Sequence, residues 1–241
     1  MEEILNALDK IERDHDVFIL HAVESGSRLW RIYDDNSDYD IRFVYSVRPE
    51  FYYSLRQEKD TIERKIEVNG MTLDLSGWEI RKALRLLLSG NAQIAEWLYS
   101  DIVYRQEIDI DPIVDLINIR NLIPAYCGLA KSHVKKYLQK GVESPKKYLY
   151  TVRSIMMAMW IDKYNKFPPL NFHELRNIIV WPEVNNSIDY ILEMKAKNKN
   201  MTDIELQLWI EDMVDKTTCS FGFITNNKWG KAQVIMNELV K

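Results

Sequence analysis

Two aspartates separated by one residue begin a short segment that is rich in aromatic and β-branched side chains. They are Asp38 and Asp40, in the run Ser37–Tyr45. Because side chains alternate between the two faces of a strand, both carboxylates are expected on one face, while Tyr39 and Ile41 contribute to a core on the other. Two carboxylates so close together repel each other unless a proton or a cation lies between them. Oxygen ligands of this kind favour Mg²⁺ or Mn²⁺ over zinc.

A third aspartate lies in a second segment with the same alternation. In Met71–Ser76 the apolar residues Met71, Leu73 and Leu75 share one face, and Asp74 lies on the other. If this strand lies beside the first, three carboxylates converge. Three carboxylates can hold two divalent ions, which stabilise the attacking and leaving oxygens of a phosphoryl transfer.

A phosphate-binding turn is expected ahead of these segments. The pair Gly26-Ser27 follows the apolar run Val17–Val23, which is typical of a buried strand. A glycine at the end of a strand lets backbone amides approach a ligand closely. Together with the Ser27 hydroxyl, those amides can bind phosphate.

The elements that must position these residues change in type along the first half of the chain. Apolar residues at helical spacing predict a helix over residues 1–14, and short apolar runs predict strands after it. The predicted strands cover residues 17–23, 38–45, 62–68 and 71–76, with a hairpin at Asn69-Gly70. From Gly77 onward the apolar spacing becomes helical. This order predicts an α+β fold, a small sheet with helices packed on it.

The second half of the chain has almost only helical spacing, with prolines at positions typical of helix ends. The predicted helices cover about residues 112–122, 125–140, 146–165, 172–178, 186–197, 202–216 and 228–240. We place a boundary near residues 105–112. It divides the chain into a catalytic domain over residues 1–108 and a helical domain over residues 109–241.

The composition is that of a globular protein. The 241 residues include 32 Lys and Arg against 36 Asp and Glu, a net charge of −4, and 46% of them are hydrophobic. These values exclude a disordered chain and allow a sizeable core. The two cysteines suit a reducing compartment, and neither a signal peptide nor a membrane-spanning run is expected, so we predict a cytoplasmic protein.

The motifs together resemble the DNA polymerase β-like nucleotidyltransferase superfamily, in which Gly-Ser, a spacer, Asp-x-Asp and a later Asp follow in this order. Within it, the chain is most similar to the predicted nucleotidyltransferases associated with RNA repair, the RlaP family, over roughly residues 17–175. The matching segments are Glu24–Trp30, Ser37–Phe43, Asp74, Gly77, Trp78, Arg81–Leu84, Glu96–Leu98, Lys146–Tyr148 and Pro168-Pro169. One difference is that Arg31 stands where the family pattern has glycine.

The resemblance implies a small mixed sheet that forms a nucleotidyltransferase core, followed by a mostly helical region. It implies a Mg²⁺-dependent (or Mn²⁺-dependent) transfer of a nucleoside monophosphate from a nucleoside triphosphate, such as ATP, to a hydroxyl, with release of pyrophosphate. Asp38 and Asp40 would bridge two metal ions, and Asp74 would complete the site of the ion that activates the acceptor. The residues implied for the triphosphate are Gly26, Ser27 and Arg28.

Positive charge gathers in the second half of this acidic chain. Residues 120–154 contain eight Lys and Arg against one acid, Glu143. Clustering of this kind indicates a phosphate-bearing partner, although a solvated helix face gives the same pattern. In polymerase β-like enzymes the helical part after the catalytic sheet contacts triphosphate and base. The candidates for that contact are Lys131, Lys146, Lys147 and Arg153.

The acceptor implied by the resemblance is nucleic acid, with an RNA 3′ end favoured. Transfer to a protein side chain, as in toxin-like nucleotidyltransferases, is the enzymatic alternative. A non-catalytic RNA- or nucleotide-binding module is disfavoured because all three aspartates are retained. Glycosyltransferases also use Asp-x-Asp, but here a Gly-Ser pair precedes it, as in polymerase-like enzymes.

Overall fold

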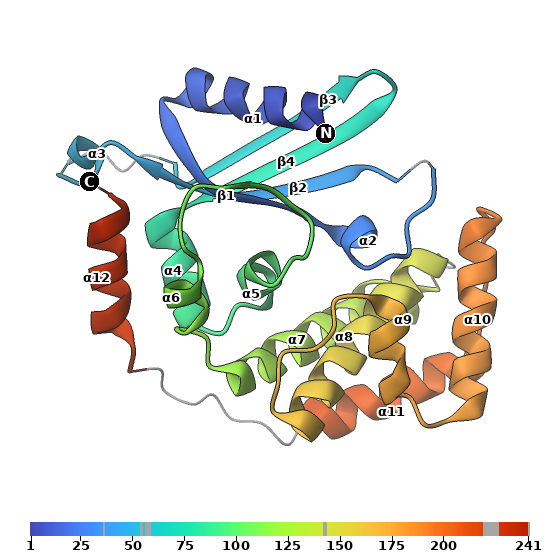
Figure 1. Cartoon of the computed structure of the whole chain (residues 1–241). Coiled ribbons are helices and arrows are strands. Elements are labelled where there is room, and N and C mark those ends of the chain that lie inside the picture. Colours follow the sequence, from blue (N-terminus) through green and yellow to red (C-terminus); the bar gives the residue numbers. More distant parts are fainter. Residues whose placement is uncertain (36, 54, 56–58, 142–143, 219–226, 241) are drawn as a thin grey trace. The chain divides into compact units, whose positions relative to one another are not determined.

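The computed structural model describes residues 1–35, 37–53, 55, 59–141, 144–218 and 227–240 (Figure 1). The internal packing of the chain divides it into two compact units. The first consists of Met1–Ile117 and Asn226–Lys241, and the second of Asn118–Thr225. The domain boundary placed near residue 108 stays a prediction.

The first unit contains a five-stranded sheet with the order β3-β4-β2-β1-β5. Its strands are β1 (Val17–Ser25), β2 (Tyr39–Val47), β3 (Thr61–Val68), β4 (Met71–Glu79) and β5 (Val103–Gln106). Strands β2 and β4 are parallel, whereas the other neighbouring pairs are antiparallel. The predicted α+β class with a mixed sheet is therefore confirmed.

The hairpin predicted at Asn69-Gly70 joins β3 to β4. The two residues have positive φ angles of 48° and 76°, as a two-residue type I′ turn requires. Val68 and Met71 pair directly beside the turn. The two-residue turn therefore determines which residues of β3 and β4 stand opposite each other.

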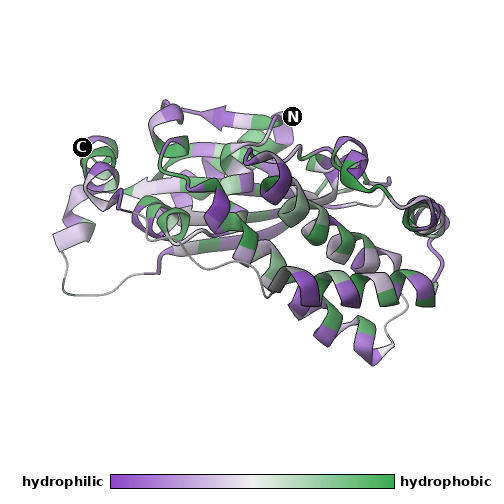
Figure 2. Ribbon diagram, turned by 90° about the horizontal axis from the view of Figure 1, so that it is seen from below, coloured by the Kyte–Doolittle hydropathy of each residue, from purple (hydrophilic) through white to green (hydrophobic). Residues whose placement is uncertain are grey.

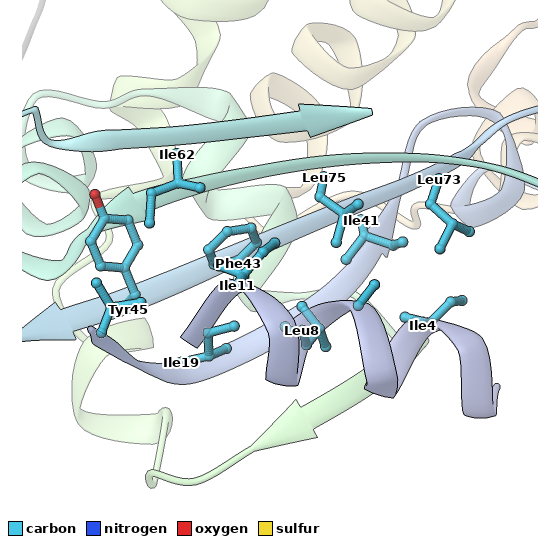
Figure 3. Packing of buried hydrophobic residues seen from close by; sticks show 13 residues of the cluster. Ile4, Leu8, Ile11, Ile19, Ile41, Phe43, Tyr45, Ile62, Leu73 and Leu75 are labelled. Carbon is cyan, nitrogen blue, oxygen red and sulfur yellow. The ribbon is translucent and has the colours of Figure 1, made fainter. Parts of the chain in front are cut away.

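Helix α1 (Glu2–His15) covers one face of the sheet (Figure 1). Its apolar residues recur at helical spacing and pack against the odd-numbered residues of β2 and β4. The core side chains labelled in Figure 3 are Ile4, Leu8, Ile11, Ile19, Ile41, Phe43, Tyr45, Ile62, Leu73 and Leu75. Because side chains alternate along a strand, the even-numbered residues of β2 and β4 lie on the opposite face.

Helices α4 (Ile80–Leu88) and α5 (Ala92–Leu98) lie on that opposite face (Figure 1). With α6 they enclose His21 and Val44 in an apolar region. The other helices of this unit are α2 (Gly26–Leu29), α3 (Pro49–Tyr53), α6 (Asp111–Val114) and α12 (Trp229–Leu239). The helical cover is therefore built mainly from the segment that follows β4.

The helical pattern predicted from Gly77 begins three residues too early, because β4 continues to Glu79. Gly77 pairs with Phe43 on β2, and a Cβ on Gly77 would lie 2.0 Å from a carbon of the Phe43 ring. The missing side chain thus makes room for the ring within the sheet. The Glu79 carboxylate then caps α4 by accepting hydrogen bonds from two backbone N–H groups of its first turn.

The second unit is helical, as predicted for this part of the chain. Its helices are α7 (Leu122–Lys136), α8 (Pro145–Tyr164), α9 (Phe172–Leu175), α10 (Pro182–Ala196) and α11 (Ile204–Thr218), with 3₁₀ turns at Ile119–Asn121, Leu138–Lys140 and Arg176–Ile178. Figure 2 shows hydrophobic and hydrophilic residues alternating along single helices. Most residues of α8 are buried, whereas α7 and α10 bury only part of theirs, so α8 contributes most strongly to the interior of the unit.

The single helix predicted over residues 112–122 is wrong. Helix α6 ends at Val114, and a separate 3₁₀ turn begins at Ile119. The backbone carbonyl of Asp115 accepts a hydrogen bond from Lys228, beside α12, instead of from a continuing helix. The apolar spacing therefore predicts a longer helix than the one that forms.

Of the two cysteines, Cys127 is buried in α7, while Cys219 lies outside the described residues. No described helix is both long enough and apolar enough to cross a membrane.

Candidate active site

Strands β2 and β4 bring two of the predicted aspartates side by side. Their parallel register places Asp40 opposite Asp74. Both side chains lie on the face turned away from α1, since Ile41 and Leu73 occupy the alternate positions in the core. Strand β4 therefore lies beside β2, the arrangement on which convergence of the carboxylates depends.

The guanidinium of Arg42 lies between these two carboxylates. Its Nη2 is 2.9 Å from Oδ1 of Asp40 and 3.2 Å from Oδ2 of Asp74. Its Nη1 donates to the backbone carbonyls of Asp74, at 2.7 Å, and Ile41, at 3.1 Å. The side chains of Arg42, Asp40 and Asp74 are 14%, 25% and 43% exposed. The charges are thus partly shielded from water, where attraction between opposite charges is stronger than at an open surface.

Asp38 lies just before β2 and has a different partner. Its Oδ2 is 3.2 Å from Nζ of Lys65 on β3. The guanidinium of Arg28 donates to the backbone carbonyls of Ser37, at 2.8 Å, and Asp38, at 3.3 Å. It also lies over the ring of Tyr39, 3.7 Å from the centroid. Arg28 therefore holds the segment that carries Asp38, and its contact with phosphate stays a prediction.

Gly26 and Ser27 begin α2 directly after β1. Gly26 has a φ of 61°, in the left-handed region that favours glycine. A Cβ at this position would lie 2.0 Å from Oδ2 of Asp40, so the absence of a side chain lets the carboxylate reach the backbone of the turn. Ser27 is buried in the same turn. The structure thus brings the predicted phosphate-binding turn and the aspartate pair together.

Glu24, two residues before this turn, is a buried carboxylate. Its Oε1 accepts hydrogen bonds from the backbone N–H groups of Asp40, at 2.7 Å, and Ser25, at 3.3 Å, and its other oxygen accepts one from the Tyr104 hydroxyl. Burial raises the pKa of the Glu24 carboxyl above its ordinary value, although the hydrogen bonds act in the opposite direction. Glu24 therefore ties the backbone of Asp40 to the end of β1.

The donor set of the aspartate pair fits a hard divalent cation. Asp40 and Asp74 offer carboxylate oxygens, which Mg²⁺ and Mn²⁺ prefer, and a positive group already lies between them. Asp38 is paired with Lys65 instead. Within the described ranges, no three His, Cys, Asp or Glu side chains stand together at ligand spacing. Asp40 and Asp74 are therefore the two carboxylates that could hold an ion together, and metal binding by Asp38, Asp40 and Asp74 stays a prediction.

The basic residues predicted to contact phosphate lie in the second unit, on α7 and α8. Lys131 and Lys146 are exposed, and Lys147 is half-buried. Nζ of Lys147 lies 4.3 Å from the centroid of the Tyr137 ring. Arg153, by contrast, is buried, with 4% of its surface exposed. The lysines are thus accessible to a ligand of this unit, and the binding of triphosphate by all four residues stays a prediction.

Comparison with known proteins identifies the family. The family profile described as the RNA repair pathway DNA polymerase beta family, RlaP, matches residues 1–222. The chain belongs to this family. The uncharacterized protein YcgL of Bacillus subtilis (strain 168) is 37% identical over 213 residues, which cover 86% of this chain and 80% of YcgL. The crystal structure of a nucleotidyltransferase-like protein from Exiguobacterium sibiricum 255-15 is 12% identical, with a TM-score of 0.37 over 97% of this chain and 79% of that one.

Arg31 stands where the RlaP pattern has glycine. Its φ is 60°, a left-handed backbone conformation. In a non-glycine residue this conformation costs about 1–2 kcal/mol. The guanidinium of Arg31 forms an ion pair of 2.8 Å with Asp101. A glycine, which adopts a left-handed conformation without this cost, suits the backbone at this position of the RlaP pattern.

The sequence reasoning missed three residues of the RlaP site. Arg42 follows Asp40 by two positions on one strand, so its place on the same face could have been read from the alternation. Lys65 could have been found by counting back from the hairpin turn, which sets it opposite Asp74. Glu24 belongs to the family-matching segment Glu24–Trp30, but only the folded chain reveals that its carboxylate turns toward a backbone N–H of β2.

Proposed function

We propose that this RlaP protein is a Mg²⁺- or Mn²⁺-dependent nucleotidyltransferase. It moves a nucleoside monophosphate from a nucleoside triphosphate, such as ATP, to a hydroxyl acceptor and releases pyrophosphate. The observation that carries this proposal is the close approach of Asp40 to the Gly26 turn, with Asp74 in register beside Asp40. Transfer of a phosphoryl group needs positive charge and oriented N–H groups around the reacting phosphate, and this end of the sheet can supply both.

The aspartate pair acts at the reacting phosphorus. The acceptor oxygen forms a bond to the α-phosphorus, the bond from the α-phosphorus to the oxygen bridging to the β-phosphate breaks, and pyrophosphate leaves. Asp74 is the more exposed of the pair, so the acceptor hydroxyl approaches from its side and gives its proton to that carboxylate. Asp40, tied to the Gly26 turn and to Glu24, keeps its position. A bound divalent ion supplies charge that stabilises the attacking and leaving oxygens.

The turn after β1 binds the remaining phosphates in this proposal. Backbone N–H groups at Gly26 and Ser27, with the Ser27 hydroxyl, hold the β- and γ-phosphates, and Arg28 in the same turn adds positive charge. Asp38 would join Asp40 as a ligand if a second divalent ion is bound. Its present ion pair with the exposed Lys65 is of a kind that contributes about 1 kcal/mol or less, so that exchange is inexpensive.

The acceptor that we propose is nucleic acid, with an RNA 3′ end favoured. The family description names an RNA repair pathway. Residues 120–154 carry the accessible lysines Lys131, Lys146 and Lys147, the last of them beside the Tyr137 ring. Lysines neutralise backbone phosphates, and aromatic rings stack on unpaired bases.

Substitution of the aspartates tests the proposed catalysis. Asp40→Asn and Asp74→Asn keep the size of the side chain and remove its charge. Each should reduce pyrophosphate release by about 10²-fold or more, roughly 2.7 kcal/mol. The melting temperature should change little, since each change removes one ion pair with Arg42 but also the repulsion between the carboxylates. Retained activity with lowered stability would contradict the proposal and indicate a structural ion pair.

A matched control comes from the other face of the sheet. Asp14 on α1 forms an ion pair of 2.6 Å with Arg64 on β3, away from the aspartate pair. Asp14→Asn should keep full transfer activity. Asp38→Asn, in the same series, decides whether Asp38 belongs to the ligand set: a loss as large as that of Asp40→Asn supports its role, and unchanged activity removes it.

Labelled nucleotides identify the acceptor. The protein is incubated with each labelled nucleoside triphosphate, Mg²⁺ and total RNA, DNA or protein, and we expect label in RNA. Label in protein would favour the toxin-like alternative. Nucleotide binding without label in any polymer would favour a non-catalytic module.

The salt dependence of RNA binding tests the lysines. Each phosphate contact to a single strand contributes about −0.7 to the slope of log affinity against log salt. Replacement of Lys131, Lys146 and Lys147 by Gln should therefore make the slope about 2 units shallower and weaken binding without a change in melting temperature. Equal affinity and slope would mean that the basic segment is a solvated surface.

A further inference from the structure

Arg42 occupies the place between Asp40 and Asp74 in which a divalent ion would be held. One nitrogen, Nη2, is within hydrogen-bonding distance of both carboxylates, at 2.9 and 3.2 Å. The other terminal nitrogen is anchored on two backbone carbonyls, one of β2 and one of β4. The side chain is thus fixed by four polar contacts in a partly buried position.

An ion and this guanidinium cannot share the place. Mg²⁺ binds oxygens at about 2.1 Å, much closer than the carboxylate oxygens lie around Nη2. Because Nη2 is the atom that contacts both carboxylates, an ion shared by them would stand where Nη2 stands, with the oxygens drawn closer to it. The positive charge of the guanidinium also repels a divalent cation at short range.

We propose that Arg42 is a positioning residue: its guanidinium holds the carboxylates of Asp40 and Asp74 together until a divalent ion replaces Nη2. This inference rests on the proposed metal-dependent transfer. With Arg42 in place, the repulsion between the two carboxylates is reduced and they are kept in register without metal, so the pair does not splay apart. The contacts of Nη1 to strand carbonyls keep the arginine at the same end of the sheet.

A consequence is that a bare ion binds weakly and an ion with nucleotide binds well. A bare ion must displace the guanidinium and leave it without an anionic partner. A nucleoside triphosphate brings negative charge to the same end of the sheet, and a guanidinium pairs well with phosphate. Arg42 therefore couples the binding of metal to the binding of nucleotide, and that coupling is reciprocal.

Calorimetric titration of Mn²⁺ into the nucleotide-free protein tests this role. Arg42→Gln removes the competing charge, so Mn²⁺ should bind about tenfold more tightly than to the wild type, within the usual range of coupling between sites. The melting temperature of the metal-free variant should fall, because the two carboxylates lose their shared cation, and Mn²⁺ should restore it. Arg42→Lys keeps the charge but loses the geometry of two terminal nitrogens. It should fold readily, and its Mn²⁺ affinity should lie between those of the wild type and Arg42→Gln.

Arg64→Gln is the matched control, since it removes one arginine of the same sheet that pairs with Asp14 on the α1 side. Its Mn²⁺ affinity should equal that of the wild type. Unchanged or weaker Mn²⁺ binding by both Arg42 variants would overturn the inference and make Arg42 a permanent support of the site. Asp40→Asn and Asp74→Asn distinguish a failure of the Arg42 inference from a failure of the proposed function. If neither variant weakens Mn²⁺ binding, the metal site itself, and with it the proposed function, is wrong.

Discussion

Gly77 in β4 and Gly26 directly after β1 each leave no room for a side chain. At each position an added Cβ would lie 2.0 Å from a neighbouring side chain. At Gly77 that neighbour is the ring of Phe43, which belongs to the core under α1. At Gly26 it is the carboxylate of Asp40, which is partly exposed. The same strands thus build a dry core and a charged end.

The difference between the two regions lies in how each close contact is stabilised. Phe43 gains dispersion and hydrophobic energy from tight packing, which needs no partner of specific charge. The carboxylate of Asp40 is partly desolvated and needs a partner of opposite charge, which is the guanidinium of Arg42. We therefore expect changes in the core to affect stability and changes at the charged end to affect transfer.

The largest expected effect is that of Gly26→Ala on transfer. The new methyl group pushes Asp40 away from the turn, and misplacement of a reacting group by about 1 Å can cost 10²-fold in rate. Pyrophosphate release should fall by about that factor. Stability should fall by about 1–2 kcal/mol, because alanine is strained at a φ of 61°. Full activity in this variant would contradict the expected role of the charged end, because Asp40 could then move away from the turn without loss of transfer.

The second effect is that of Gly77→Ala on stability. Overpacking against the Phe43 ring should lower the free energy of unfolding by about 1–3 kcal/mol, measured by urea denaturation. Transfer per folded molecule should be that of the wild type. In a Phe43→Leu background the same substitution should cost less, because the smaller side chain leaves room for the methyl group. A strictly additive double variant would mean that the two residues do not meet.

A smaller effect is expected on the pH dependence of stability, through His21 in the apolar region under α4 and α5. Burial lowers the pKa of His21 below its ordinary value of 6.5, although a contact of Nε2 with the Trp97 carbonyl at 3.4 Å acts in the opposite direction. As the pH falls below 6.5, the unfolded chain takes up a proton that the folded chain resists, so the free energy of unfolding falls. His21→Gln should reduce this loss, measured by urea denaturation between pH 7 and 5.

His133 also has a lowered pKa, first through burial and then through Lys147 and Lys136, so the slope should shrink rather than vanish. Identical slopes for the wild type and His21→Gln would show that the region around His21 admits water and is not like the core.

The smallest effect is expected at the loop between the two motifs. Arg31→Gly relieves the left-handed strain but loses a surface ion pair and adds freedom to the unfolded chain. We expect a gain of up to about 1 kcal/mol in the free energy of unfolding, with transfer unchanged. A loss of stability would mean that the ion pair with Asp101 outweighs the strain.

Predictions from the sequence succeeded where the signal is local. The spacing of Ile4, Leu8 and Ile11 predicted α1, and Asn69-Gly70 predicted the hairpin. They failed at Gly77, where helical spacing begins inside β4, because a glycine matched to a ring on another strand has no local signature. They failed again after Val114, where Lys228, more than a hundred residues away, accounts for the Asp115 carbonyl.

The sequence by itself determined which residues share a strand face. Alternation placed the side chains of Asp40 and Ile41 on opposite faces of their strand, Asn69-Gly70 indicated the hairpin, and the family motifs indicated a nucleotidyltransferase. Each of these follows from the geometry of a few consecutive residues.

Only the tertiary structure decided that Asp40 and Asp74 lie in register with Arg42 between them, and that Gly26 admits the Asp40 carboxylate. Strands β2 and β4 are distant in sequence, and their parallel register depends on the core that Phe43 and its neighbours form with α1. The energy of that core is a sum over many contacts distant in sequence, which no local spacing encodes. The charged end of the sheet is therefore positioned by the apolar region beside it.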